Sequence, residues 1–229
     1  MKKPAVDYRE LRPSTITEPR YRHLLLLLGW AVYFALYFLT ENLIPLEKCH
    51  VVHSPLDDAI PFCEYFVIPY TLWYVLIVGS LLYFALYNVR SFCKLQTFIM
   101  ITQAAAMIVY ILWPNRQELR PAALPRENFF TWIISIIYDF DTPSGVCPSL
   151  HVAYSIGIAS VWCKEKGVPL GFKAFIVAFV CVICVSTAFI KQHSVVDIFA
   201  ALPVGLLAEV ILYWKDYWKP RLAKKAESA

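Results

Sequence analysis

Apolar residues in this chain come in long runs separated by short polar stretches. A helix needs roughly 17–25 apolar residues to cross a bilayer, and five of the runs approach that length. Two of the runs contain a proline, Pro69 and Pro203, which membrane helices tolerate better than soluble helices do. The pattern therefore predicts five membrane-spanning helices: Leu24–Thr40, Phe66–Tyr87, Thr97–Trp113, Ala174–Ile190 and Ser194–Trp214.

A sixth apolar run, Leu150–Cys163, is shorter than the others. It follows Pro148 and leads into a charged turn, so we interpret it as a sixth span whose outer end is sunk in protein. The predicted fold is all-α: one bundle of six transmembrane helices with both termini in the cytoplasm. We expect a loose cytoplasmic tail over residues 1–22, the membrane domain over residues 23–215 and a basic cytoplasmic tail over residues 216–229.

Composition and charge favour the same class. Apolar residues make up 59% of the chain, against about 45–50% in ordinary globular proteins. If the N-terminus is cytoplasmic, only five lysines and arginines fall outside: Lys48, Arg116, Arg120, Arg126 and Lys191. This is the positive-inside asymmetry of membrane proteins. The net charge of +4 therefore reflects topology and does not indicate nucleic-acid binding. We expect a multi-pass protein of the plasma membrane.

Three outer segments carry the polar residues that are scarce elsewhere. The first follows the third span and contains Arg116 and Arg120, the second is TPSGVCPSLH (residues 142–151), and the third runs from Lys191 into the last span. Each cation taken alone can be explained by snorkelling toward headgroups. Because the topology brings all three segments to one membrane surface, we expect them to form a single site there.

The last of these segments reads IKQHSVVDIF and contains His193 and Asp197. Residues four apart lie on one face of a helix. A carboxylate inside an apolar run is costly and is usually paired or functional. A carboxylate bound to one ring nitrogen of a histidine fixes its tautomer and leaves the other nitrogen free to react. The alternative is a helix-capping pair without chemistry.

The segment TPSGVCPSLH contains two Pro-Ser pairs, of which the second is followed by a histidine, His151. Ser149 and the unpaired amides at the start of the fourth helix form a natural anion site, since the helix dipole favours negative charge there. His151 falls in the first turn of that helix, beside any bound phosphate. We interpret Pro143-Ser144-Gly145 as a plain turn that leads into it.

Together these residues resemble the type-2 phosphatidic acid phosphatase superfamily of integral membrane lipid phosphatases. That family carries a Lys-x6-Arg-Pro motif, then Pro-Ser-Gly-His, then Ser-Arg-x5-His-x3-Asp. In this chain Arg120-Pro121 matches the end of the first motif. Pro148-Ser149-Leu150-His151 matches the second with leucine in place of glycine, and Ser186, His193 and Asp197 match the third at the right spacing.

Two cations of the family pattern are absent. The first-motif lysine would fall at Trp113, and the third-motif arginine is Thr187. Arg116 and Lys191 are the candidates to replace them. The Ser-Leu-His form of the second motif is similar to that of inositol phosphorylceramide synthases, which move a phosphorylated headgroup between lipids.

The resemblance implies a mechanism. His193, oriented by Asp197, attacks phosphorus and forms a phosphohistidine, while His151 protonates the leaving oxygen and then activates the second acceptor. Charge on the phosphate oxygens is stabilised by Arg120 and Ser149, with Arg116 and Lys191. The resemblance implies no metal and no cofactor.

Three functions remain open at this stage. The first is a phosphatase that hydrolyses a phosphomonoester or pyrophosphate of a lipid at the outer face. The second is a lipid phosphotransferase, which the Ser-Leu-His form favours. The third is a non-catalytic lipid-binding or transport protein, which both histidines and Asp197 argue against. We expect hydrolysis, because neither outer loop shows a feature specific for an acceptor.

Two further outer segments leave structural alternatives open. Cys49, His50 and His53, with Asp57 and Asp58 nearby, could bind a metal, but no established ligand spacing fits them, and a polar cap over the site is the preferred interpretation. Cys49 and Cys63 share this loop, and a disulfide between them is an open alternative. The apolar stretch at residues 128–140 is too short to span and is expected to lie at the outer interface.

Overall fold

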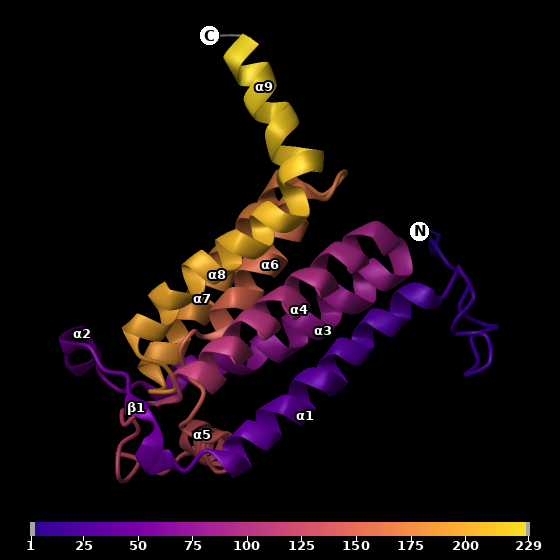
Figure 1. Cartoon of the computed structure of the whole chain (residues 1–229). Helices are drawn as coiled ribbons and strands as arrows, with labels where there is room; N and C mark the ends of the chain where they lie inside the picture. The colour runs from indigo at the N-terminus through magenta and orange to yellow at the C-terminus, as the bar shows by residue number, and fades with distance from the viewer. Residues whose placement is uncertain (1–2, 228–229) are drawn as a thin grey trace.

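The structure is a computed structural model that describes residues 3–227, so residues 1–2 and 228–229 of the two expected tails lie outside the described part. The regular elements of the described chain are helices, apart from one pair of two-residue strands (Figure 1). The α-helices are α1 (Leu28–Leu43), α2 (Pro55–Ala59), α3 (Val67–Tyr87), α4 (Val89–Leu112), α5 (Phe129–Phe140), α6 (Leu150–Lys164), α7 (Leu170–Phe189), α8 (Val195–Tyr213) and α9 (Lys219–Glu227). The strands are β1 (His50–Val51) and β2 (Asn115–Arg116). Short 3-10 turns cover Arg22–Leu27, Leu46–Lys48 and Glu64–Phe66, and a π turn covers Trp214–Trp218.

Within residues 3–227, five helices are long and apolar enough to cross a membrane, and each overlaps one of the five long predicted runs. The third begins at Val89, eight residues before the predicted start, because the Asn88 side chain accepts the backbone N–H of Ser91 and caps the helix there. The residues that follow are partly polar, so hydropathy alone missed them. The five helices are Arg22–Leu43, Glu64–Tyr87, Val89–Leu112, Leu170–Phe189 and Val195–Lys225.

The sixth predicted span is helix α6, which has 15 residues. At 1.5 Å per residue it is about 22 Å long, which is shorter than the roughly 30 Å hydrocarbon core of a bilayer. It packs against α3, α4, α7 and α8 in the centre of the bundle. Gly157 permits one close approach, because a Cβ there would lie 2.6 Å from the ring of Phe98. The six-span arrangement itself stays a prediction.

The bundle has a single main core, built from α3, α4, α6, α7 and α8. Its centre consists of fully buried residues such as Phe84, Ile99, Ile158 and Ile183. The outward faces of the long helices instead expose large apolar side chains, of which Leu206 on α8 is one. An apolar surface of this extent suits a lipid solvent and would be unusual in a soluble protein.

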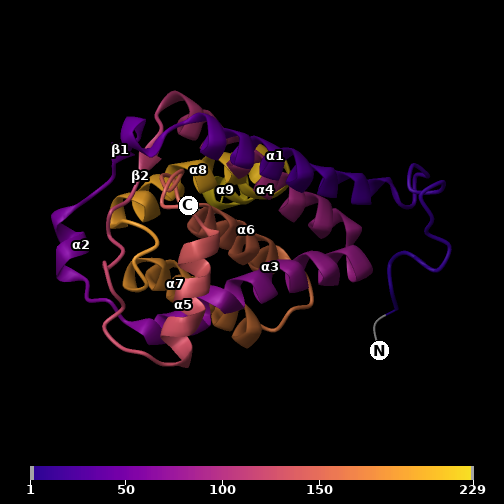
Figure 2. The ribbon, with the colours of Figure 1, turned by 90° about the horizontal axis from the view of Figure 1, so that it is seen from below.

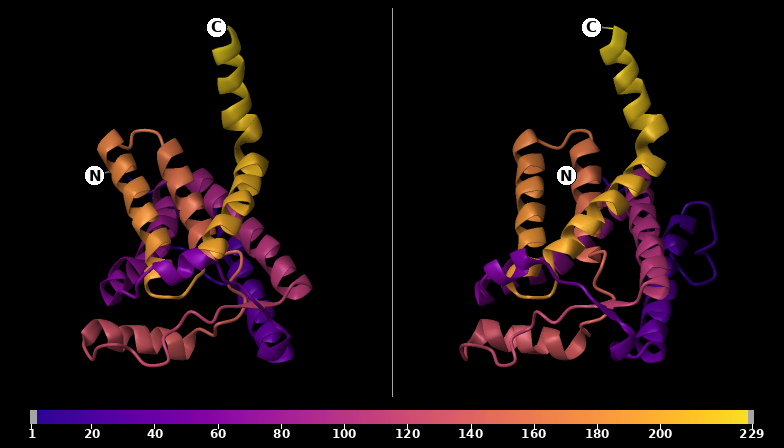
Figure 3. Two further views of the ribbon diagram at one scale, coloured as in Figure 1. Left: turned by 90° about the vertical axis from the view of Figure 1, so that its left-hand side faces the viewer. Right: turned by 60° about the vertical axis from the view of Figure 1, so that its left-hand side comes forward.

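The described parts of both tails lie at one end of the bundle (Figures 1 and 3). The N-terminal segment is held against that end, although its composition favours a loose tail. The Tyr8 hydroxyl donates to the carbonyl of Ala85 at 2.7 Å and contacts His23 Nε2 at 2.8 Å, and Tyr21 is fully buried. At the other terminus the last span continues through the π turn into α9.

The opposite end of the bundle carries the loops that the charge pattern predicts to be outside (Figure 2). Strand β1 pairs in parallel with β2, and Arg116 of β2 also bridges to Ser144. Three segments far apart in the sequence are thereby joined. Helix α5 has 12 residues, begins at an Asn128 capping box and runs across this end at a wide angle to the long helices (Figure 3). This is the arrangement expected of a short interfacial helix.

Candidate active site

The turn between α7 and α8 positions His193. The backbone N–H groups of Gln192 and His193 both donate to the carbonyl of Thr187, at 2.9 and 3.1 Å. Lys191 in this turn has φ = 56°, a left-handed conformation that is uncommon outside glycine. Its ammonium group compensates by donating to the carbonyls of Asp57 and Ile60, at 2.8 and 2.6 Å. Backbone hydrogen bonds and the bonds of the Lys191 side chain therefore both fix the conformation of this turn.

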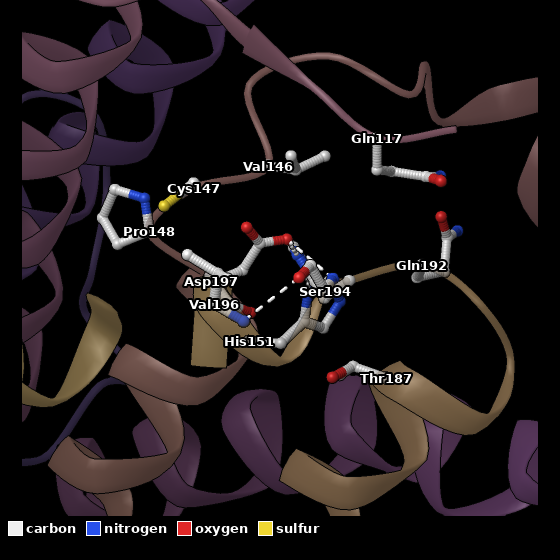
Figure 4. A network of polar contacts seen from close by, with 12 residues as sticks. Gln117, Val146, Cys147, Pro148, His151, Thr187, Gln192, Ser194, Val196 and Asp197 are labelled. Atoms are coloured by element: carbon white, nitrogen blue, oxygen red, sulfur yellow. Dashed lines mark hydrogen bonds and ion pairs between the residues drawn. The ribbon is translucent and has the colours of Figure 1, made fainter. Parts of the chain in front are cut away.

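His193 and Asp197 form a buried pair. The Nδ1 of His193 lies 3.1 Å from Oδ2 of Asp197, and the two residues are 7% and 0% exposed. The same Oδ2 accepts the backbone N–H of Ser194 at 3.0 Å, which completes a capping box at the start of α8. Asp197 thus caps the helix and holds the imidazole at once, so the two interpretations of this motif are compatible. Figure 4 shows Asp197, Ser194 and His151 close together, with Thr187 on the last turn of α7.

His151 is the second histidine of the cluster. Its Nδ1 lies 3.3 Å from Nε2 of His193, and its ring packs between those of Trp73 and Tyr70, with centroids 4.3 and 4.7 Å away. Ser149 is fully buried and caps α6. Its backbone N–H donates to the carbonyl of Asp197 at 3.1 Å, so the start of α6 is bonded directly to the first turn of α8.

The hydrogen-bond network assigns the tautomers of this pair. Because Asp197 accepts from Nδ1 of His193, the Nε2 of that ring carries the lone pair. His151 then donates its Nδ1–H toward this lone pair. The two nitrogens are 3.3 Å apart, so no third group fits between them in this arrangement. His151 Nε2 is buried without a partner among the described residues.

Arg120 is bonded to Gln192, the residue that precedes His193. Its guanidinium donates to the carbonyls of Tyr138 and Asp141, at 3.0 and 2.7 Å, and to Oε1 of Gln192 at 2.7 Å. It also covers the Tyr138 ring at 4.5 Å. Burial lowers the pKa of Arg120 and raises the pKa of Asp141 relative to their ordinary values. Arg120 is therefore placed one residue from the histidine cluster and tied to α5.

The two candidate replacement cations have other partners. Arg116 forms a 2.5 Å ion pair with Glu118. The ammonium group of Lys191 donates two hydrogen bonds, to the carbonyls of residues 57 and 60 described above. Both lie in segments that border the cluster. The Nη1 of Arg116 pairs with Glu118, whereas its Nε is buried without a partner among the described residues. Of the phosphate-binding candidates, Arg120 and Ser149 are bonded directly to the segments that carry His193 and Asp197.

Sequence reasoning missed two polar residues that shape the site. Asp57 is buried, and its carboxylate accepts the Ser194 hydroxyl at 2.6 Å and the Val195 N–H at 2.8 Å, so an outer loop caps α8. The capping-box spacing from Ser54 to Asp57 was the signal available. Oδ1 of Asn115 accepts hydrogen bonds from the backbone N–H groups of Val146 and Cys147. No local sequence pattern predicts that role.

The cysteine and histidine residues of the outer loop do not assemble into a site. Cys49 and Cys63 are free thiols, so the structure contains no disulfide between them. His50 stacks on Trp113 with ring centroids 5.6 Å apart, and His53 contacts Asp58 at 3.0 Å. Among the residues that the structure describes, no group of three histidine, cysteine or acidic side chains has the arrangement of a metal site.

Comparison with known proteins adds one structural neighbour. No protein-family model and no curated protein matches this chain. Among solved structures, the crystal structure of Aquifex aeolicus LpxE is similar, at 20% sequence identity and a TM-score of 0.47. The match covers 78% of this chain and 92% of that one. At this level of likeness the neighbour does not decide the chemistry, which has to be argued from the site residues.

Proposed function

We propose that this chain is an integral membrane lipid phosphatase that hydrolyses a phosphomonoester or pyrophosphate of a lipid through a phosphohistidine. The observation that carries the proposal is the contact of the buried Asp197 and His193 with each other and with His151, over 3.1 and 3.3 Å. The motif resemblance to the type-2 phosphatidic acid phosphatase superfamily points to the same chemistry. The apolar helices are long enough to cross the membrane in which such a substrate resides.

His193 is the nucleophile in this proposal. Asp197 accepts the hydrogen bond from Nδ1–H, so the lone pair of Nε2 is available to attack phosphorus. A bond forms between Nε2 and phosphorus, and the bond from phosphorus to the leaving oxygen breaks. Asp197 also stabilises the positive charge that develops on the imidazole ring. It acts through its orientation and charge, as the carboxylate of a hydrolase triad does.

His151 is the general acid and base. In its protonated, cationic form His151 donates its Nδ1–H to the leaving oxygen once substrate has separated the rings, and the ring that remains is neutral with its proton on Nε2. In the second step the same nitrogen accepts a proton from water as the phosphohistidine is hydrolysed. The aromatic rings of Tyr70 and Trp73 hold the imidazole in a water-poor environment, which suits proton exchange with the substrate.

The phosphate oxygens are bound by Arg120 and by the first turn of α6. Ser149 caps that helix, and the N-terminal amides of a helix favour an anion. Arg116 and Lys191 contribute positive charge at the same end of the bundle, although Nη1 of Arg116 and Nζ of Lys191 already have protein partners. Helix α5 crosses the same end of the bundle as the histidines (Figure 3) and would flank a lipid headgroup that approaches from the membrane. We place this end on the extracytoplasmic side.

The test is a phosphate-release screen of the purified full chain over a panel of lipid phosphates, which includes phosphatidic acid, phosphatidylglycerophosphate and polyprenyl pyrophosphate. His193→Ala should release no phosphate above background and should remain folded, because no neighbouring group can form the covalent intermediate. Wild-type-like release from a folded His193→Ala variant would end this mechanism. If inositol, glycerol or diacylglycerol acceptors yield a new phosphorylated lipid and little free phosphate, the chain is a transferase instead.

A further inference from the structure

Two buried glutamines beside the histidine cluster have no structural explanation. Gln117 is 2% exposed and Gln192 is 3% exposed. The side-chain nitrogen of each has no hydrogen-bond partner among the described residues. Buried amide donors are nearly always paired, and an unpaired one in a native structure calls for a functional reason.

The orientation of both amides is determined by their oxygen atoms. Oε1 of Gln192 accepts from the Arg120 guanidinium at 2.7 Å, and Oε1 of Gln117 accepts from the Leu119 backbone N–H at 2.5 Å. Turning either amide over would place its NH2 group against another donor. The two NH2 groups are therefore held away from these partners, with their hydrogens available.

One amide lies in the loop that carries His193, and the other lies in a segment bonded to the loop that leads to His151. Gln192 immediately precedes His193 and is held by the Thr187 carbonyl. Gln117 follows β2, and its backbone N–H donates at 2.9 Å to the carbonyl of Pro143, at the start of the loop that leads to His151. Figure 4 shows both glutamine side chains on the same side of the cluster formed by His151, Ser194 and Asp197.

We propose that the NH2 groups of Gln117 and Gln192 bind oxygens of the phosphate group, in the place of the two cations that Trp113 and Thr187 have replaced. This inference rests on the proposed function. Of the two candidate cations that remain nearby, Lys191 is bonded to backbone carbonyls and Arg116 is paired with Glu118, although the Nε of Arg116 is buried without a partner among the described residues. Neutral donors that are fixed in a buried site stabilise phosphate charge effectively, because they need no reorganisation when the charge develops.

The decisive variants are Gln117→Glu and Gln192→Glu. A glutamate keeps the size of the side chain and the oxygen that accepts from Leu119 or Arg120, so a purely structural role would survive. It replaces the NH2 donor by an oxygen, which repels phosphate. We expect each variant to remain folded, to lose about 100-fold or more in kcat/KM, and to bind vanadate, a mimic of five-coordinate phosphorus, at least about 10-fold more weakly.

Gln96→Leu is the matched control. Gln96 is also fully buried, but its amide is satisfied by Trp30 and the Leu26 carbonyl on the other half of the bundle. We expect it to lower the unfolding temperature and to leave vanadate binding unchanged. If both glutamate variants bind vanadate and release phosphate as the wild type does, the amides are not phosphate ligands, and the proposed function stands. If the wild type binds vanadate and releases no phosphate, the proposed function fails, and vanadate binding by the variants still decides the role of the amides.

Discussion

Replacing Asp57 should disable the site from a distance, because this residue holds the start of α8. Its buried carboxylate accepts three hydrogen bonds: from the backbone N–H of Ser54 at 2.7 Å, from the Ser194 hydroxyl at 2.6 Å and from the Val195 N–H at 2.8 Å. Two of these donors belong to the residues that directly follow His193. Asp57 is therefore a positioning residue for the nucleophile.

The size of the effect follows from these bonds. A hydrogen bond to a charged group contributes about 1.5–3 kcal/mol. Asp57→Ala leaves the donors of Ser194 and Val195 without their acceptor in a buried position, so we expect a destabilisation of about 3–5 kcal/mol. That is a large share of the roughly 5–15 kcal/mol that stabilises an ordinary domain. Asp57→Asn keeps one acceptor oxygen and should lose about 1–2 kcal/mol.

Activity should fall further than stability alone predicts. The Ser194 N–H shares Oδ2 of Asp197 with His193, so a shift of this residue disturbs the orientation of the imidazole. A displacement of about 1 Å can cost about 100-fold in rate. For Asp57→Asn, measured below its unfolding temperature, we expect kcat to fall by about that factor with little change in KM, because the phosphate ligands are untouched.

The assays are thermal unfolding of the detergent-solubilised chain and phosphate release from its best lipid substrate. Asp58→Ala is the control, since Asp58 is the neighbouring residue and its exposed carboxylate contacts only His53 among the ion pairs described. An exposed pair of this kind contributes about 0–1 kcal/mol. The reasoning is refuted if Asp57→Ala and Asp58→Ala unfold at the same temperature and turn over substrate at the same rate.

Two further predictions concern the relay and the topology. Asp197→Asn should lower kcat by several orders of magnitude, by analogy with the factor of about 10⁴ in serine protease triads; a rate within tenfold of wild type would show that the carboxylate does not orient His193. Ala123→Cys and Lys166→Cys place thiols at exposed positions on opposite ends of the bundle. An impermeant maleimide added to intact cells should label the first above the parent background and not the second, and the reverse pattern would put the chemistry in the cytoplasm.

Much of the fold could be predicted from hydrophobic periodicity. Five apolar runs correspond to the five long helices, because a bilayer demands continuous apolar length and satisfied backbone groups. The short apolar stretch that became α5 was also recognisable, since 12 residues cannot cross. Helix starts were less predictable. The first residues of α4 are partly polar, and a cap at Asn88 together with packing against other helices made them helical.

Local spacing likewise indicated the pairing of His193 with Asp197, since a separation of four residues on a helix brings two side chains together. It could not predict the 3.3 Å contact with His151, which depends on how α6 and α8 pack. Nor did spacing reveal that the ammonium group of Lys191 would donate hydrogen bonds to backbone carbonyls. A lysine in a left-handed turn, next to a loop with free carbonyl groups, finds these partners only after the chain has folded.

The sequence by itself determined that the protein is suited to a lipid environment, and it determined the approximate number of its helices and the residue types of its site. These properties follow from composition and from contacts within one turn of helix. Only the tertiary structure decided which side chains meet across distant loops. Asp57, Gln117 and Gln192 lie outside the recognised motifs. Their importance arises from burial and from hydrogen bonds between segments up to 138 residues apart, and no local pattern encodes a partner at that distance.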